Sequence, residues 1–303
     1  MTERPQVSIV IVNYKVKDLL FHCLKSVYRF TSIDTETWVV DNDSRDGTEE
    51  MLKMEFPKVH FIGNNFNAGF PGANNQALKQ CSGEYIFLLN PDTEFVHDCI
   101  PGLVAFSKTK NDNCILAPRL LNTDGSIQFS IQPFISFWEI FFEVFYLHNY
   151  LKRIKSYYRE EIQQPIRIEA ASGAALFFHR TVMDRIGMLD EDLFWTEDME
   201  FCYRASKKNI DRYYLPGVKI MHHIGQSGKK NQAVMISNQL LSKIRYFYKT
   251  RGRFAGSMVA VLRFIQVITR IIVLYPLSVL MPQLRQRAQG YMFTLKRLVK
   301  GDF

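Results

Sequence analysis

A short apolar run that ends abruptly at Asn90-Pro91-Asp92 constrains the fold more than any other stretch of this 303-residue chain. Residues 86–89 are all apolar, and such a run stopped by a proline is typical of a strand buried on both faces, as in a parallel sheet. Asp92 would then lie at the carboxyl end of the strand, the edge of an open α/β sheet where ligands bind. The alternative is a simple turn, because Asn-Pro-Asp-Thr is also favourable turn sequence.

Three further strands are expected before this one, with helices between them. After the first strand, apolar residues recur at helical spacing, and Asp46 or Thr48 is the expected N-cap of the helix that follows the second strand. Strands that alternate with helices in this way predict a parallel, doubly wound sheet with right-handed crossovers. The segments that carry these strands and the loops leading into their helices are residues 7–14, 37–48, 60–65 and 67–78.

Polar residues follow the first two predicted strands at the same edge of the sheet as Asp92. Asn13 and Tyr14 end the first strand, and Asp41 and Asp43 follow the second. The alternative role for the two aspartates is turn formation and helix capping. We interpret the convergence of three polar strand ends as a nucleotide site, which three independent turns would explain less well.

The glycine-rich loop over residues 67–78 also suggests phosphate binding. Its glycine spacing matches neither GxGxxG nor the Walker pattern. A dinucleotide-binding fold and a P-loop enzyme are therefore disfavoured.

Composition predicts a globular, cytosolic protein with a basic surface. The apolar content of 47% is normal for a packed core, and no charged-apolar-small leader precedes the first strand. The net charge of +8 concentrates toward the C-terminus, which suits an anionic membrane better than nucleic acid, and no nucleic-acid-binding motif is present. The five cysteines lack CxxC spacing and are expected to be reduced thiols: Cys23, Cys81, Cys99, Cys114 and Cys202.

Seven segments, in order, resemble the motifs of family 2 glycosyltransferases, which have the α/β GT-A fold. In the first half these are VSIVIVNY, VVDNDSRDGT, NAGFPGANNQAL and LLNPDTE. In the second half they are ASGAALFFHR, IGMLDEDLFWTEDMEFCYRA and YYLPGVKIMHHIGQS. The resemblance covers Val7 to about Lys249 and is greatest to the rhamnosyltransferase-like branch of the family.

The resemblance implies which residues hold the nucleotide-sugar. Asn13, Tyr14 and Asp41 would hold the nucleobase and ribose, with Asp43 beside them. The further expected contacts are Asn67, Gly69, Asn74, Asn90, Asp92 and His223.

The family also implies a divalent metal, Mn²⁺ or Mg²⁺, that bridges the diphosphate oxygens. Its usual Asp-x-Asp motif stands here as Asn90-Pro91-Asp92, so Asp92 is the one carboxylate left and metal affinity is expected to be lower. His222, within the pattern H-x-x-G-x-S completed by Gly225 and Ser227, would be the second protein ligand. The alternative for the histidine pair is an ordinary surface position at a strand end.

The segment WTEDMEF carries the paired carboxylates Glu197 and Asp198. Inverting sugar transfer needs a general base that deprotonates the acceptor hydroxyl, and Asp198 matches the family's base. The alternative is a helix N-terminus, where carboxylates favour the macrodipole. Both roles are compatible, since the first turn of a helix can also present a side chain to a cleft.

We expect a GT-A domain over residues 1–250, with a donor half over about 1–95 and an acceptor half over about 96–250. An aromatic insertion with a basic end, residues 134–158, fits either a membrane-facing surface or a core helix pair. Residues 251–303 are expected to form a basic, amphipathic helical tail in which Arg263 and Arg270 reach lipid headgroups while apolar residues face the acyl chains. A homodimer formed through this helix is the alternative.

The sequence thus predicts an inverting glycosyltransferase, peripheral on the cytoplasmic face of the cell membrane. It would move rhamnose or a similar sugar from a dTDP- or UDP-linked donor to a lipid-linked or cell-surface glycan acceptor. The alternatives are a transferase of another sugar and a GT-A scaffold that binds nucleotide-sugars without turnover, which the departure at Asn90 would favour.

Overall fold

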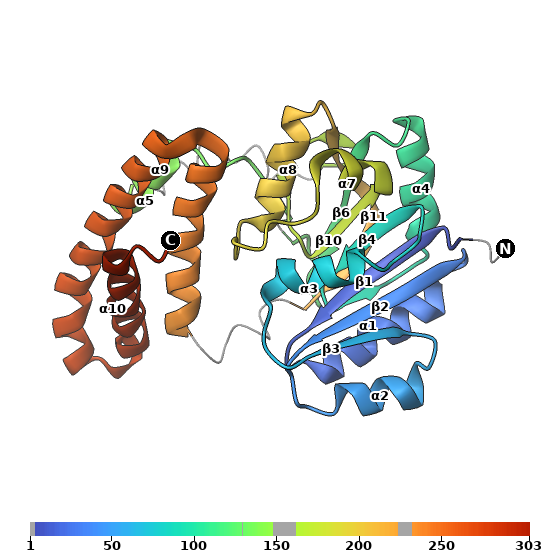
Figure 1. Ribbon diagram of the computed structural model, residues 1–303, viewed down its shortest axis with the longest axis horizontal. Helices are drawn as coiled ribbons and strands as arrows, with labels where there is room; N and C mark the ends of the chain where they lie inside the picture. The colour runs from blue at the N-terminus through green and yellow to red at the C-terminus, as the bar shows by residue number, and fades with distance from the viewer. Residues whose placement is uncertain (1–3, 129, 148–161, 224–231) are drawn as a thin grey trace. The chain divides into compact units, whose positions relative to one another are not determined.

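The computed structural model describes residues 4–128, 130–147, 162–223 and 232–303 (Figure 1). The chain divides into two compact units. The sheet unit comprises Met1–Pro133, Glu161–Glu191 and Glu197–Ser227. The helical unit comprises Phe134–Glu160, Asp192–Thr196 and Gly228–Phe303. The boundary expected at residue 250 falls inside the helical unit, which also contains the described part of the aromatic insertion.

The first half of the large sheet is parallel, as predicted. Its strands lie in the order β3, β2, β1, β4, and every residue of β1 is buried, as expected for a strand covered on both faces (Figure 1). The strands are β1 (Val7–Asn13), β2 (Thr35–Asn42), β3 (His60–Asn64) and β4 (Tyr85–Leu89). The connecting helices are α1 (Lys17–Phe30), α2 (Thr48–Glu55) and α3 (Gly69–Leu78).

The start of α2 differs from the sequence expectation. Its N-cap is Gly47, which has a left-handed φ of +82° that glycine adopts without strain. Asp46 accepts a hydrogen bond from the backbone N–H of Thr48 at 3.2 Å, so it does serve the first turn. Neither Asp46 nor Thr48 is itself the N-cap.

The second half makes the sheet mixed rather than wholly parallel. β10 lies antiparallel between β4 and β6, β11 is parallel to β6, and β5 is antiparallel to β11 at the far edge. Apolar patterning reports burial and not strand direction, so the sequence did not reveal this change. The strands are β5 (Thr93–Phe95), β6 (Cys114–Leu121), β8 (Ile166–Arg167), β10 (Ala175–His179) and β11 (Asp211–His222).

Three helices and a small two-stranded sheet complete the sheet unit. The two-stranded sheet joins β7 (Ile131–Gln132) to β9 (Ala170–Ala171). The helices are α4 (Ile100–Thr109), α7 (Arg180–Ile186) and α8 (Glu197–Lys207). The hydrophobic core lies between the sheet and helices α1, α2 and α4, with Phe87 and Phe177 fully buried at its centre.

Among its described residues, the helical unit contains α5 (Phe137–Val144), α9 (Gln232–Leu280), a short 3₁₀ turn η2 (Pro282–Leu284) and α10 (Arg285–Lys300). Gly252 interrupts α9 with a φ of +86°, which divides it into a proximal arm, 232–251, and a distal arm, 253–280. The arms fold back on each other (Figure 1). A Cβ on Gly256 would overlap the ring of Tyr248, so the arms touch just beyond the bend.

Arg263 and Arg270 of the distal arm are buried, which corrects the expectation that they reach lipid headgroups. Arg263 is fully buried and donates to Glu143 of α5 at 2.9 Å, while Lys243 of the proximal arm donates to the same carboxylate at 2.8 Å. Burial alone would raise the pKa of Glu143, but Arg263 and Lys243 outweigh it and lower that pKa to about 2.

Arg270 is also buried, and it donates to the backbone carbonyls of Glu143 and Val144 at 3.4 and 3.3 Å. Its guanidinium lies over the ring of Tyr146, with Cζ 3.3 Å from the ring centroid. Both arginines thus bond to residues of the aromatic insertion, which lies more than 100 positions earlier in the chain. Helical periodicity placed these arginines on one face correctly but could not show what that face meets.

We predict that Gly83→Ala destabilises the protein by about 1–3 kcal/mol, a typical cost of overpacking. A Cβ at Gly83 would lie 2.5 Å from the backbone nitrogen of Ser8, where β4 begins beside β1. The matched control is Gly217→Ala, where a Cβ meets nothing within 4 Å. Urea unfolding followed by tryptophan fluorescence gives both midpoints, and equal midpoints would contradict the prediction.

Candidate functional site

A buried polar cluster joins the carboxyl ends of β1 and β2. Asn13 Nδ2 donates to Asp41 Oδ1 at 2.8 Å, Ser44 Oγ at 3.1 Å and Thr48 Oγ1 at 3.0 Å. Asp41 Oδ2 accepts from the backbone N–H of Ser44 at 3.0 Å. Asn13 Oδ1 is buried and has no hydrogen-bond partner among the residues that the structure describes. The cluster therefore presents one free acceptor, which is costly to leave unmatched.

Tyr14 and Asp43 lie on the exposed side of this edge. Asp43 has a left-handed φ of +60° and pairs with Arg45 at 2.7 Å. The ammonium of Lys15 lies 5.0 Å from the centre of the Tyr14 ring. Both predicted residues are partly exposed at this edge.

The glycine-rich loop is tied to the end of β2 through Asn42. Asn42 Nδ2 donates to the carbonyl of Gly69 at 3.2 Å, and Asn42 Oδ1 accepts from Asn64 at 3.0 Å. Asn67 Oδ1 accepts from the N–H of Gly69 at 2.9 Å. Asn74 points into its own helix, where its Nδ2 donates to the carbonyl of Phe70 at 2.8 Å. Asn67 thus precedes α3 and Gly69 begins it, whereas Asn74 is buried within the helix.

Asn90-Pro91-Asp92 forms a turn, and this turn directly follows the buried strand β4. The turn and the carboxylate at the strand end, which the sequence offered as alternatives, are therefore both present. The N–H of Thr93 donates to the carbonyl of Asn90 at 3.2 Å and closes the turn. The N–H of Asn90 donates to the carbonyl of Ala174 at 3.0 Å. This second bond attaches the turn to the segment that enters β10.

Asp92 and His222 lie side by side although 130 positions separate them in the chain. β5 pairs with the end of β11, with Thr93 opposite His222, and this register places Asp92 Oδ1 3.2 Å from His222 Nε2. The opposite ring nitrogen, Nδ1, lies 2.6 Å from Gln128 Oε1. A neutral His222 that donates from Nδ1 to Gln128 has its Nε2 lone pair directed toward Asp92.

His223 is oriented differently from His222. Its Nε2 lies 2.8 Å from Glu94 Oε1, and its backbone N–H donates to the carbonyl of Asp92 at 2.8 Å. His223 therefore braces the turn that carries Asp92. Gly225 and Ser227, the rest of the predicted motif, lie outside the described residues.

Asp198 lies in the first turn of α8, as the helix-terminus interpretation also required. Its Oδ2 accepts from the N–H of Gly173 at 2.7 Å, and its Oδ1 accepts from its neighbour Met199 at 2.7 Å. A Cβ on Gly173 would lie 3.3 Å from that of Asp198, so only glycine allows this approach without crowding. Burial raises the pKa of Asp198 to about 6, although the side chain still reaches solvent.

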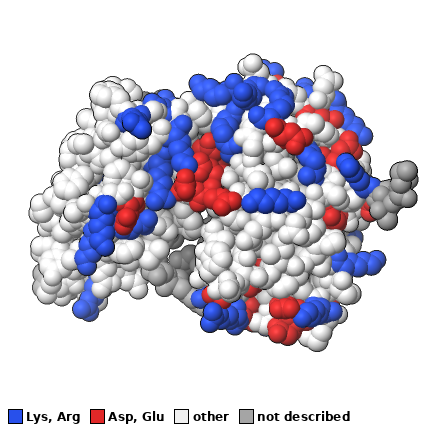
Figure 2. Space-filling model, in the orientation of Figure 1, with Lys and Arg blue, Asp and Glu red and all other residues white. Residues whose placement is uncertain are grey.

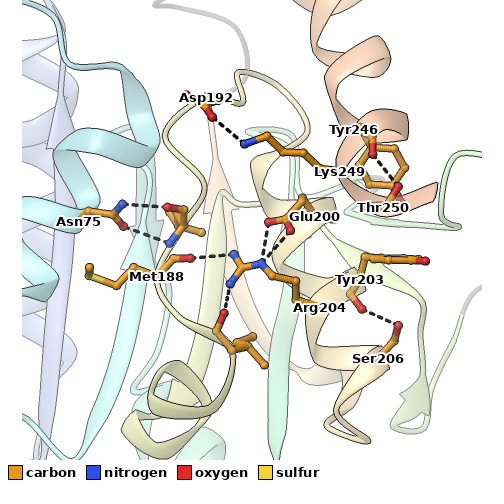
Figure 3. Close-up of polar contacts among 12 residues, drawn as sticks. Asn75, Met188, Asp192, Glu200, Tyr203, Arg204, Ser206, Tyr246, Lys249 and Thr250 are labelled. Atoms are coloured by element: carbon orange, nitrogen blue, oxygen red, sulfur yellow. Dashed lines mark hydrogen bonds and ion pairs between the residues drawn. The ribbon is translucent and has the colours of Figure 1, made fainter. Parts of the chain in front are cut away.

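The neighbouring carboxylates have different surroundings. Glu197 also lies in the first turn of α8 and is partly buried. Glu200 is buried and held by Arg204 Nε, 2.8 Å from its Oε1 (Figure 3). Arg204 also donates to the carbonyls of Ile186 and Met188. Glu200 thus helps to fix the loop that precedes α8 and is not available as a base.

That loop is also tied to α3 by Asn75, as Figure 3 shows. Asn75 Nδ2 donates to the carbonyl of Leu189 and to Glu191 Oε1, both at 2.8 Å, and its Oδ1 accepts from the N–H of Leu189 at 3.1 Å. The loop and the glycine-rich segment are therefore fixed relative to each other. Asn75 and the part of the loop that it contacts, residues 189–191, lie within the sheet unit.

Sequence reasoning missed three residues that shape the site: Asn75, Gln128 and Gly173 in its hydrogen-bonding role. Gln128 gave no signal, because it lies outside every motif and meets His222 only through the fold. Asn75 was inside a quoted motif, NAGFPGANNQAL, yet its neighbour Asn74 was chosen. Gly173 lies inside the motif ASGAALFFHR, and its N–H is the donor to Asp198.

In the described part of the chain, no group of three or more His, Cys, Asp or Glu side chains is arranged to hold a metal. Asp92 and His222 form a two-residue pair instead. A divalent cation held by one carboxylate, one imidazole and substrate phosphates needs no further protein ligand, so the residues present fit such an ion.

The mixed α/β sheet, with polar residues at the strand ends along one edge, has the GT-A fold. Two solved structures share it. A mannosyltransferase of Pyrobaculum calidifontis, solved with GDP-Man and Mn²⁺, superposes with a TM-score of 0.56 at 13% identity, over 98% of this chain and 88% of its own. GalNAc-T7, solved with UDP, GalNAc and Mn²⁺, gives 0.58 at 17% identity, over 82% and 50%.

The chain belongs to glycosyl transferase family 2, whose sequence profile matches residues 8–187, and the predicted family is confirmed. It is 29% identical over 210 residues to the low-salt glycan biosynthesis hexosyltransferase Agl10 of Haloferax volcanii, covering 67% of this chain and 62% of that protein. It is 24% identical over 243 residues to an N-acetylglucosaminyl-diphospho-decaprenol L-rhamnosyltransferase of Mycobacterium tuberculosis, covering 74% and 78%. The match thus spans less than two thirds of Agl10.

The raised pKa of Asp198 gives a pH-dependent stability prediction. Because the folded pKa lies above the ordinary value of 3.8, the protonated side chain favours folding, and this contribution is lost as the pH rises through about 6. The asparagine side chain of Asp198→Asn does not ionise, so the variant does not lose this stability at high pH. The free energy of unfolding of Asp198→Asn, relative to the wild type, should therefore be about 2 kcal/mol higher at pH 8 than at pH 4. This figure allows for solvent screening of part of the pKa shift.

Thermal unfolding of both proteins across this pH range measures the difference. Asp184→Asn, an exposed carboxylate of α7, is the matched control and should show no such trend. A constant difference for Asp198→Asn across the range would mean that its pKa is not raised.

Proposed function

We propose that this protein transfers a sugar, with inversion, from a nucleotide-diphosphate sugar to a hydroxyl of a lipid-linked or cell-surface glycan acceptor. Its family membership supports the reaction class. The observation that carries the assignment of the base is the position of Asp198. Its carboxylate is hydrogen-bonded to Gly173, while the next residue, Ala174, holds the Asn90-Pro91-Asp92 turn.

Asp198 acts as the general base in this proposal. Each of its oxygens accepts one backbone hydrogen bond, which leaves further lone pairs to take the proton of the acceptor hydroxyl. With its pKa at about 6, Asp198 is ionised at neutral pH yet more basic than an ordinary aspartate. The oxygen then attacks the anomeric carbon from the side opposite the diphosphate. Glu197, beside it on α8, is assigned a supporting role.

Asp92 and His222 would hold the divalent metal, Mn²⁺ or Mg²⁺. When bound, such an ion neutralises charge that develops on the diphosphate leaving group. Gln128 fixes the imidazole of His222 through Nδ1, so that Nε2 remains free as a ligand atom beside Asp92. The two solved structural neighbours were both obtained with Mn²⁺, which supports this assignment.

The nucleotide would bind at the ends of β1 and β2. Asn13 is fully buried, so in this proposal it supports the nucleotide end of the site by holding Asp41, Ser44 and Thr48 in place. The proposed nucleotide is UDP or dTDP. Tyr14, Asp41 and Asp43 complete this end of the proposed site. The residues on the sugar and phosphate side would be Asn67, Gly69, Asn74, Asn90, Asp92 and His223. Asn74 is buried in α3 and would act by supporting this segment.

The printed names of the relatives support the proposed donor and acceptor. One transfers L-rhamnose to a diphospho-decaprenol-linked N-acetylglucosamine, and a second relative, from Shigella flexneri, is named a dTDP-rhamnosyl transferase. We therefore propose rhamnose or a similar hexose as the sugar and a polyprenyl-linked glycan as the acceptor. Such an acceptor places the enzyme at the cytoplasmic face of the cell membrane.

A second candidate is a GT-A scaffold that binds nucleotide-sugars without turning them over. The observation in its favour is Asn90, which leaves the metal pair with a single carboxylate. Release of free nucleotide diphosphate from a panel of dTDP- and UDP-sugars, with Mn²⁺ or Mg²⁺ present, separates the two candidates.

We predict that Asp198→Asn lowers transfer by about 10²–10⁴-fold while donor binding persists, because the amide keeps the shape of the carboxylate but is not basic. Initial rates and calorimetric titration with donor measure the two quantities. Asp184→Asn is the control and should leave both unchanged. A transfer rate within tenfold of the wild type would remove Asp198 from this role.

We also predict that Asp92→Ala, His222→Ala and Gln128→Leu each weaken Mn²⁺ binding in the presence of UDP by roughly tenfold or more. The first two changes remove ligand atoms, and the third releases the imidazole from its orientation. Electron paramagnetic resonance of free Mn²⁺ measures binding without any turnover. His22→Ala on α1 is the control, and unchanged Mn²⁺ affinity in all three variants would exclude this pair as the metal site.

A further inference from the structure

The distal arm of α9 has the reverse of the polarity expected for a helix of a water-soluble protein. Between Phe254 and Val279 the only charged residues are Arg263 and Arg270, and both are buried. Val261 and Arg270 are separated by nine residues, or two and a half turns, so they lie on opposite faces. The charged face is turned inward and the apolar face outward.

The outward face is long and lacks charge. Val261 is 60% exposed, Ile272 66% and Val279 77%. Their spacing continues from Phe254 along a single helical stripe of about 38 Å, at 1.5 Å per residue. The large apolar side chains exposed on the distal arm are Phe254, Met258, Val261, Phe264, Ile265, Ile272, Val273, Tyr275, Leu277 and Val279.

Basic side chains flank this apolar face at both ends. Arg253 precedes it, and Arg285 and Arg287 follow it; all three are exposed. Figure 2 shows scattered basic side chains on the helical unit beside a broad surface free of Lys, Arg, Asp and Glu. An uncharged apolar stripe between basic ends matches a membrane surface, with acyl chains beneath anionic headgroups.

We propose that the distal arm of α9 lies in the plane of an anionic membrane, with its outward face immersed among the acyl chains. By length and composition alone α9 could cross a bilayer. A helix surrounded by lipid is apolar all round, however, whereas here one face packs on α5 and holds two arginines. An in-plane position leaves that face within the protein and places only the opposite face in lipid.

Arg263 and Arg270 bond to α5, and this changes how the helix is expected to attach to the membrane. Because neither guanidinium is available to headgroups, most of the binding comes from apolar immersion, which salt does not screen. Arg253, Arg285 and Arg287 add an electrostatic contribution to membrane affinity, which depends on anionic lipid. Attachment should therefore persist at high salt, whereas attachment through headgroup-bound arginines would be released.

This inference deepens the membrane association proposed above, and its test requires neither donor nor acceptor. The full-length protein is floated with vesicles of pure phosphatidylcholine and with vesicles that also contain phosphatidylglycerol, each at low and high salt. We expect binding to both, tighter to the anionic vesicles, with the phosphatidylcholine component unchanged by salt. No binding to phosphatidylcholine, or complete release by salt, would overturn the proposal.

The double substitution Val261→Glu and Ile272→Glu should reduce vesicle binding at least tenfold. Both positions are exposed, so folding should be retained, as circular dichroism can verify. Each single substitution is matched by the control Met54→Glu, which introduces one glutamate at a 75% exposed apolar residue of α2 and should bind like the wild type. Replacing Arg253, Arg285 and Arg287 with glutamine should remove only the preference for anionic vesicles.

Light scattering of the lipid-free protein tests the other occupant, a second copy of the chain. A dimer that the double glutamate variant dissociates, together with absence of vesicle binding, would assign this face to self-association and refute immersion. Loss of vesicle binding would leave the assignment of Asp198 untouched, since its variants are measured on soluble donor.

Discussion

Two backbone hydrogen bonds at consecutive residues hold the proposed site together. The N–H of Gly173 donates to Asp198, and the carbonyl of Ala174 accepts from the N–H of Asn90. The entry of β10 therefore fixes the carboxylate of α8 and the turn after β4 at the same time. Because β10 is hydrogen-bonded to β4 in the middle of the sheet, neither group can move without disturbing the core.

Strand pairing positions the two proposed metal ligands, Asp92 and His222. β5 is three residues long and lies at the edge of the sheet, yet its register against β11 brings Asp92 and His222 to 3.2 Å. Gln128 and Glu94 then fix the two histidines in different directions. The result is one imidazole nitrogen directed at Asp92 and one histidine that braces the turn. A single carboxylate is sufficient in this arrangement if phosphate oxygens supply the remaining ligands.

In the helical unit, buried basic side chains also find their hydrogen-bond partners inside the protein. Glu143 accepts hydrogen bonds from both Arg263 and Lys243 within the unit, and Arg270 contacts two backbone carbonyls and a tyrosine ring. Arg263 and Arg270 interrupt the apolar sequence of the distal arm, but they are absent from its outward face. Paired in this way, buried arginines are compatible with a neighbouring face that is wholly apolar.

The sequence by itself determined the first four strands, the helices between them, the turn at Asn90 and the position of Asp198 in the first turn of a helix. These features depend on local patterns of apolar residues, proline and glycine, which report burial and chain direction changes over a few residues. Only the tertiary structure decided the antiparallel insertion of β10, the contact of Gln128 with His222 and the inward orientation of Arg263. Each of these joins residues more than 60 positions apart, and no local pattern records which distant residue will meet a buried group.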